Sequence, residues 1–223
     1  MITSKISQLR NNDTYIDLCT YPKDYLNCLN YEYLIKEIPC RALKMGNIPF
    51  NDFNEDNFKF VIEATIGGIE KIETEELSKG IAIIHFYDIS DAMQMRLSRL
   101  VYSKRQIVSI FGEEYPVTNK KRPPNNGTIV VFNVPSNISD QVVITKFNKF
   151  GPIRQLRRTP KKETQRFIEF FDIRDADCAK NQLNRRMVNF FGCKSRISID
   201  FSHPGSYRLN NSKYYTSNLP ERT

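Results

Sequence analysis

The hydrophobic pattern of the second half of the chain predicts two strands with a helix between them. Residues 126–135 form a run rich in β-branched side chains that ends at a proline, which is typical of a buried strand. Residues 166–172 form a second run, and its final aspartate is suited to capping a helix. Between the runs, apolar residues recur at helical spacing, after a serine and before a glycine: Val143, Phe147 and Phe150.

The first half shows a similar pattern. Residues 43–49 predict a strand that ends in Asn-x-Pro, and Asn54 is a candidate cap for the next helix. That helix is indicated by apolar residues at helical spacing: Phe58, Ile62 and Ile66. A later helix is expected to carry Met93, Leu97 and Leu100. Further strands are expected at 69–72, 79–86 and 106–110.

Two motifs recur with almost the same offset. Residues 86–92 (FYDISDA) lie 84 positions before residues 170–176 (FFDIRDA), and residues 47–49 (NIP) lie 86 positions before residues 133–135 (NVP). We interpret the chain as two copies of one domain. The order of elements in each copy is the ferredoxin-like βαββαβ arrangement. The predicted fold class is α+β, with two tandem domains that each have a four-stranded antiparallel sheet and two helices on one face.

The repeat divides the chain into five predicted segments. These are a polar leader, the first domain, a basic linker that contains prolines, the second domain and a polar tail: 1–37, 38–117, 118–127, 128–202 and 203–223. In the leader, Leu26, Leu29 and Tyr33 share a helical stripe. A short packed helix and a mobile leader both fit that stripe.

The composition is that of a globular protein without a membrane segment. Hydrophobic residues make up 40% of the 223, yet no run approaches the 18 apolar residues that a membrane helix needs. The first residues lack the pattern of a signal peptide. The five cysteines are odd in number and form no Cys-x-x-Cys pair, which favours free thiols in a reducing compartment. We therefore expect a nuclear or cytoplasmic protein.

Charge separates the two halves. Residues 118–223 hold 20 Lys and Arg against 8 Asp and Glu, a net charge of +12, whereas residues 1–117 hold 13 against 17, a net charge of −4. This contrast points to a polyanionic partner for the second half. A basic surface without a ligand is the alternative.

No motif of a known catalytic or metal site is present. The sequence has no phosphate-binding glycine loop, no dinucleotide fingerprint and no His-Glu-x-x-His. Its two histidines are His85, expected at the surface of a sheet, and His203. We predict no enzyme, no catalytic residue, no metal and no cofactor.

The second copy resembles an RNA recognition motif (RRM), a domain that binds single-stranded RNA on its open sheet face. The RRM octet of the third strand maps onto residues 163–170. Strand alternation places on the core side Ile129, Val131, Ile168 and Phe170. It places on the open side Val130, Phe132, Gln165, Phe167 and Glu169. The usual stacking positions, of which only the last is aromatic here, are Val130, Gln165 and Phe167.

Basic residues surround these positions. They comprise Arg154, Arg157, Arg158, Lys161, Lys162 and Arg166, with Lys120, Lys121 and Arg122 in the linker. Beside exposed aromatic rings, such a set favours phosphate contacts over a merely solvated surface. Coverage of the rings by a terminal segment or by the other domain is the alternative.

The first copy offers less to RNA. Its stacking positions are Lys44, Ile81 and Ile83, with no aromatic ring among them. We interpret it as a domain that positions the second copy or binds a protein partner. For the whole chain, the alternative to RNA binding is a protein-interaction adaptor. The pattern leaves the oligomeric state open.

The second copy also resembles the second RRM of the Mei-two-like (terminal-ear) proteins, a family of RNA-binding regulators of meiosis and development. The resemblance rests on residues 127–133, 157–160, 167–174 and 202–205, and more loosely on 86–89 in the first copy. It implies RNA binding through Phe132, Phe167 and the basic residues named above. It also implies a role in post-transcriptional or meiotic and developmental regulation.

Overall fold

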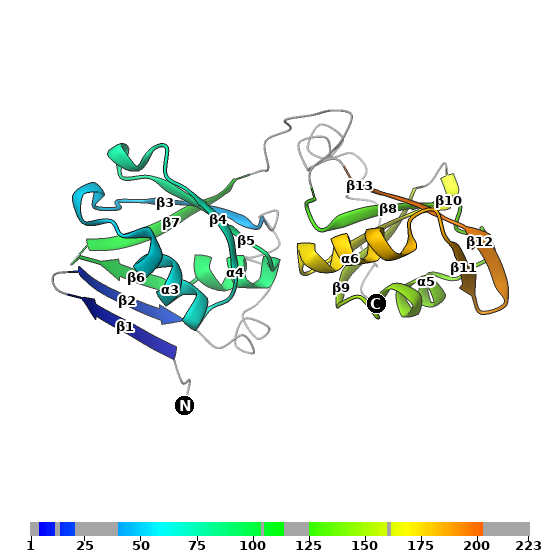
Figure 1. The fold of residues 1–223 in the computed structure, drawn as a ribbon, viewed down its shortest axis with the longest axis horizontal. Helices are drawn as coiled ribbons and strands as arrows, with labels where there is room; N and C mark the ends of the chain where they lie inside the picture. Colours follow the sequence, from blue (N-terminus) through cyan, green and yellow to red (C-terminus); the bar gives the residue numbers. More distant parts are fainter. Residues whose placement is uncertain are drawn as a thin grey trace, which may run out of the picture. The chain divides into compact units, whose positions relative to one another are not determined.

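The computed structural model divides the chain into two units, Met1–Glu113 and Glu114–Thr223 (Figure 1). It describes residues 5–11, 14–20, 40–103, 105–113, 125–159 and 162–202. Antiparallel sheets and four α-helices occur in these residues, so the α+β class is confirmed. Among these helices, none combines the length and the apolar composition of a membrane span.

The second unit contains a four-stranded sheet with the order β13-β8-β10-β9. Its strands are β8 (Thr128–Phe132), β9 (Ile153–Thr159), β10 (Lys162–Phe170) and β13 (Ser198–Phe201). Its helices are α5 (Asp140–Phe147) and α6 (Ile173–Leu183). A separate hairpin precedes the last strand and consists of β11 (Met187–Phe190) and β12 (Cys193–Arg196). Without this hairpin, the element order is the predicted βαββαβ.

The core of the second unit lies between this sheet and its two helices. All four predicted core-side strand residues are fully buried: Ile129, Val131, Ile168 and Phe170. They share one hydrophobic cluster with residues of both helices: Val143, Phe147, Ala176, Ala179 and Leu183. Because the four strand residues point to one face, α5 and α6 must pack on that face.

The first unit contains a seven-stranded sheet with the order β1-β2-β6-β7-β3-β5-β4. Its strands are β1 (Lys5–Asn11), β2 (Thr14–Thr20), β3 (Ala42–Gly46), β4 (Ile69–Glu73), β5 (Ala82–Phe86), β6 (Arg99–Tyr102) and β7 (Arg105–Glu113). The helices are α3 (Glu55–Thr65) and α4 (Ile89–Arg96), and the 3-10 turns are η1 (Phe50–Asp52) and η2 (Leu77–Lys79). The part β7-β3-β5-β4 has the same strand order, relative to the chain, as the sheet of the second unit.

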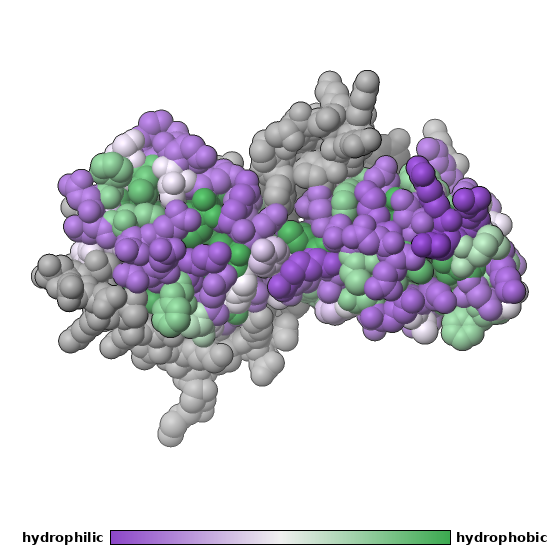
Figure 2. Space-filling view, viewed as in Figure 1, coloured by the Kyte–Doolittle hydropathy of each residue, from purple (hydrophilic) through white to green (hydrophobic). Residues whose placement is uncertain are grey.

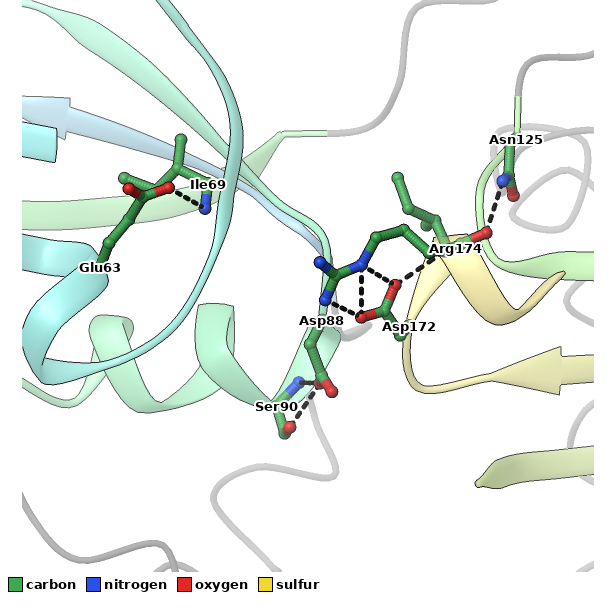
Figure 3. A network of polar contacts seen from close by, with 8 residues as sticks. Glu63, Ile69, Asp88, Ser90, Asn125, Asp172 and Arg174 are labelled. Atoms are coloured by element: carbon green, nitrogen blue, oxygen red, sulfur yellow. Dashed lines mark hydrogen bonds and ion pairs between the residues drawn. The ribbon is translucent and has the colours of Figure 1, made fainter. Parts of the chain in front are cut away.

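Both copies of the repeated motif cap a helix in the same way (Figure 3). The carboxylate of Asp88 accepts a hydrogen bond of 2.7 Å from the amide of Ser90 at the start of α4. The carboxylate of Asp172 accepts one of 2.7 Å from the amide of Arg174 at the start of α6. The cap predicted at Asp172 is therefore confirmed, Asp88 caps α4 in the same way, and each satisfies an amide that the helix leaves unpaired.

The second aspartate of each motif lies against a glycine. A Cβ atom added to Gly67 would meet the carboxylate of Asp91 at 1.9 Å, and one added to Gly151 would meet that of Asp175 at 1.8 Å. Each glycine therefore leaves room for a carboxylate that a side chain would displace. Both pairs are 84 positions apart in the two copies, which matches the offset of the motif itself.

Residues 5–20 differ from the polar leader that the sequence predicted. β1 and β2 form an antiparallel hairpin, and β2 pairs with β6 of the first unit. Ile16 and Leu18 are fully buried in the same hydrophobic cluster as Leu100 and Tyr102. The helix considered for Leu26, Leu29 and Tyr33 lies outside the described residues.

The second helix of the first unit is shorter than its apolar spacing predicted. α4 ends at Arg96, and Leu100 lies in β6, where it pairs with Ile107 of β7. The side chain of Leu100 is buried, as a helix position would also have required. Short apolar runs do not distinguish helix from strand, and this one was assigned wrongly. The last strand, predicted at 106–110, is confirmed within β7.

Candidate nucleic-acid interface

The candidate site is the face of the second unit's sheet that points away from α5 and α6, here called the sheet face. Residue register pairs Phe167 with Val130 on β8 and with Arg157 on β9. On β13, Ser198 pairs with Phe132. Strand alternation therefore gives the sheet face these members: Val130, Phe132, Gln155, Arg157, Gln165, Phe167, Glu169, Ser198 and Asp200.

Two phenyl rings stand on the sheet face. Phe132 is 36% exposed, and Phe167 is half-buried. The guanidinium of Arg157 lies over the ring of Phe167, 5.6 Å from its centroid. Such a cation–π interaction contributes about 0.5–1 kcal/mol at an exposed site. The contact is weak enough for a stacked nucleobase to replace it.

The middle of the sheet face is buried and contains two polar residues beside Val130. Val130 is 6%, Gln165 8% and Glu169 5% exposed. Arg154 donates to Oε1 of Glu169 at 2.9 Å. Among the described residues, Oε2 of Glu169 and Oε1 of Gln165 accept no hydrogen bond. Two buried acceptors thus lie on either side of Phe167 along β10 without a donor.

Arg166 and Arg158 lie on the opposite side of the sheet from Phe167. Nε of Arg166 donates to Asp140 at 2.9 Å, and Nε of Arg158 donates to the same carboxylate at 2.8 Å. Arg166 is completely buried, so its expected contact with RNA does not fit the structure. Its position in β10 has the parity of Ile168, which points to the helices. Arg158 is exposed, although on that helix side.

Asp140, at the start of α5, holds these two arginines. Partial burial by itself would raise the pKa of its carboxyl, but the hydrogen bonds and charges of Arg158 and Arg166 outweigh it and lower the pKa. The sequence pattern alone did not indicate a role for Asp140. Its position directly after Ser139, which caps α5, was the available signal, because a carboxylate in a first turn is held in place by the helix.

The remaining predicted basic residues are only partly described. Lys162 is exposed at the start of β10, beside the end of β9. Four others lie outside the described residues: Lys120, Lys121, Arg122 and Lys161. The structure thus brings Arg157 to the sheet face, joins Arg154 to Glu169 of that face, and keeps Arg158 and Arg166 away from it.

The corresponding face of the first unit has no aromatic ring at the positions expected to stack. Lys44 of β3 pairs with Ile83 of β5, and Ala42 pairs with His85. His85 is 2% exposed, which corrects the expectation of a surface histidine, and its Nε2 lies 3.0 Å from Oε1 of Glu73. Burial, assisted by the charge of Lys71, lowers the pKa of His85.

The described residues contain no group of three or more His, Cys, Asp or Glu side chains that could hold a metal ion. Cys40, Cys178 and Cys193 form no disulfide bond.

Comparison with known proteins relates the chain to RNA-binding domains. The RNA recognition motif family matches residues 129–191. Protein MEI2-like 3 of Arabidopsis thaliana is 32% identical over 182 residues, which cover 80% of this chain and 23% of that protein. Protein MEI2-like 4 of Oryza sativa subsp. japonica is 31% identical over 183 residues, which cover 81% of this chain and 18% of that protein. The chain thus spans about a fifth of the length of these relatives.

Among solved structures, the SXL-lethal protein/RNA complex is 17% identical, with a TM-score of 0.31. The match covers 73% of this chain and 99% of that chain. A likeness at this level supports no conclusion about function.

Proposed function

Since the chain is an RRM protein of the MEI2-like family, a family of RNA-binding proteins and not of enzymes, we propose that it binds single-stranded RNA, mainly on the sheet face of the second unit. The observation that carries this proposal is the pair of phenyl rings, Phe132 and Phe167, beside Arg157 on a matched RRM sheet. Aromatic rings on such a sheet stack on bases, and neighbouring arginines hold phosphates.

We infer that binding replaces existing contacts on the sheet face. A base that stacks on Phe167 takes the place of the Arg157 guanidinium, which then becomes available to a phosphate. The unpaired oxygens of Gln165 and Glu169 accept hydrogen bonds from amino or imino groups of bases. Supplying a donor to a buried acceptor removes a cost of about 1–3 kcal/mol. These two residues therefore favour bases that present N–H groups over bases that present only acceptors.

The size of the site predicts modest affinity. One or two stacked bases contribute about 1–3 kcal/mol each, and the phosphate contacts are screened by salt. We expect a dissociation constant on the order of micromolar for the second unit. If about five phosphates are neutralised on a single strand, the logarithm of the binding constant falls with the logarithm of salt concentration with a slope of about −3.5.

We further propose that the first unit is a second RRM that contributes little to base stacking. It repeats the strand order of the second unit, but Lys44 and Ile83 stand where stacking rings are expected. Its half of the chain carries a net charge of −4. A role in positioning the second unit or in binding a protein partner fits these features. For the whole chain, family membership supports post-transcriptional regulation in meiosis or development, in the nucleus or the cytoplasm.

The second candidate function is a protein-interaction adaptor. The observation in its favour is the burial of Val130 and Gln165, two of the three usual stacking positions. On this hypothesis, removal of Phe167 would leave RNA retention unchanged.

The test compares Phe167→Ala and Phe132→Ala with Ile83→Ala, the matched change on the first unit's sheet. Fluorescence anisotropy with a labelled single-stranded RNA library, at two salt concentrations, measures binding by the full chain. We expect about a 5-fold or greater loss for Phe167→Ala, the equivalent of one stacked base. We expect a smaller loss for Phe132→Ala and none for Ile83→Ala. Equal losses from Phe167→Ala and Ile83→Ala, or no binding at low salt, would overturn the proposal.

A further inference from the structure

The turn of the β11–β12 hairpin holds an aromatic residue in a conformation that disfavours it. Phe191 has a φ of 50° and Gly192 a φ of 101°, between Phe190 and its register partner Cys193. This is the geometry of a two-residue type I′ turn, which strongly favours Asn-Gly. A bulky residue at positive φ is an outlier that calls for a functional reason.

Phe191 gains no burial in exchange for this strain. Its side chain is 77% exposed. Within the hairpin, Val188 and Phe190 are buried in the core of the second unit, so the hairpin is anchored without the ring of Phe191. The turn therefore presents a phenyl ring to solvent from a fixed support.

The outer face of the hairpin is basic. It carries Met187, Asn189, Lys194 and Arg196, all exposed, and Arg185 and Arg186 precede it. No acidic residue occurs between Asp177 and Asp200. Figure 2 shows single hydrophobic side chains among hydrophilic ones where β11 and β12 lie. An exposed ring on a hairpin that also presents Lys194 and Arg196 is suited to stack on a base while these cations contact the neighbouring phosphates.

The hairpin is joined to the end of β8 that carries Phe132. The hydroxyl of Ser195 donates to the carbonyl of Asn133 at 2.6 Å, and Nδ2 of Asn133 donates to the carbonyl of Arg196 at 3.4 Å. Ser198, two residues beyond Arg196, pairs with Phe132. The outer face of the hairpin therefore continues from the edge of the sheet face.

We propose that this outer face and the ring of Phe191 form a second RNA contact, which takes the part of a single strand that extends past Phe132. The proposal rests on the proposed function, because it extends the same bound strand. Positive charge without any acidic residue favours a polyanion, and Phe191 and Met187 together are too small an apolar area for a protein interface of ordinary size.

The decisive variant is Phe191→Asn, which places the preferred residue at the first central position of the turn. A merely structural role for Phe191 predicts unchanged binding and an equal or higher unfolding temperature. The proposal predicts an equal or higher unfolding temperature together with weaker binding of long RNA. Phe60→Ala, which removes another exposed ring (62% exposed) from a helix of the first unit, is the matched control.

Binding of the full chain is measured with single-stranded RNAs of about 4 and about 12 nucleotides, lengths within the range that OB-fold domains cover on single strands. We expect Phe191→Asn to weaken the binding of the long RNA by about 5-fold or more and to leave the binding of the short RNA unchanged. Phe167→Ala should weaken the binding of both RNAs, and Phe60→Ala should weaken the binding of neither. If Phe167→Ala weakens the binding of both RNAs and Phe191→Asn binds both as tightly as the unsubstituted chain does, the hairpin contact is refuted. RNA binding on the sheet face would then still be supported.

Two further outcomes separate this proposal from the proposed function. If neither RNA binds the unsubstituted chain at low salt, the proposed function itself fails. A different result would be that a poly-glutamate peptide binds the chain, that Phe191→Asn abolishes this binding, and that RNA binding is unchanged. In that case the hairpin binds an acidic protein partner and the RNA contact is refuted.

Discussion

Removing the carboxylate of Asp140 should destabilise the second unit far more than removing Arg158, the exposed arginine of the same cluster. Arg166 is fully buried and Asp140 is its partner at 2.9 Å, so Asp140→Ala leaves a buried cation without a carboxylate. Breaking a buried pair from one side costs about 3–5 kcal/mol. Because the side chain of Asp140 is 38% exposed, we expect about 2–4 kcal/mol.

Two companion variants separate charge from packing. Arg158→Ala removes the other partner of Asp140, whose side chain is 47% exposed, and should cost about 0–1 kcal/mol. The double variant Asp140→Ala with Arg166→Met replaces the buried pair by an apolar side chain. It should recover most of the lost stability, because the buried cation is then gone.

Urea titration followed by two-dimensional amide NMR measures these effects in the full chain, since the cross-peaks of β10 report on the second unit alone. If Asp140→Ala costs no more than Arg158→Ala, the assigned dependence of Arg166 on this carboxylate is wrong. Failure of the double variant to recover stability would contradict the same reasoning.

The same cluster predicts the direction of a pH effect. The two arginines hold the pKa of Asp140 below its ordinary value of 3.8. A carboxyl with a lowered folded pKa stabilises the fold above its unfolded pKa, and that contribution is lost as the pH falls through the folded pKa. The stability of the second unit should therefore fall below pH 3.8, and Asp140→Asn should flatten this part of the curve.

Two predictions concern the first unit. Tyr102→Phe removes a hydroxyl that accepts from the amide of Asn54 at 2.7 Å and donates to the carbonyl of Asp52 at 2.8 Å; we expect a loss of about 1–3 kcal/mol in a urea titration, and a loss near zero would contradict it. The pKa of His85 is lowered from 6.5, first by burial and then by the charge of Lys71. The folded state therefore binds this proton less readily than the unfolded state, so stability should fall as the pH drops below 6.5; comparison of His85→Gln with the unsubstituted chain at pH 7.5 and 5.5 checks this.

The sequence predicted the elements whose pattern is local. Alternation along β8 and β10 gave the buried set that includes Ile129 and Phe170, and the repeated aspartates gave the caps Asp88 and Asp172. Each of these depends only on neighbours within a few residues. The local sequence pattern was therefore sufficient to predict these buried residues and caps.

The residues whose role was predicted wrongly or not at all include some that depend on contacts with residues distant in the chain. The role of Arg166 is set by Asp140, 26 residues earlier, which a count of positive charges cannot reveal. His85 was placed on the correct strand, but its burial comes from the surrounding structure. The strained turn at Phe191 was missed because its Phe-Gly pair lacks the usual turn sequence.

The N-terminal hairpin limits how the chain can be divided. A fragment that starts at residue 38 keeps β3 to β7 with α3 and α4 but loses Ile16 and Leu18. Such a cut uncovers Leu100 and Tyr102 and turns β6 into an unprotected edge, where another chain can add its own strand. A boundary at residue 38 thus cuts through the sheet of the first unit.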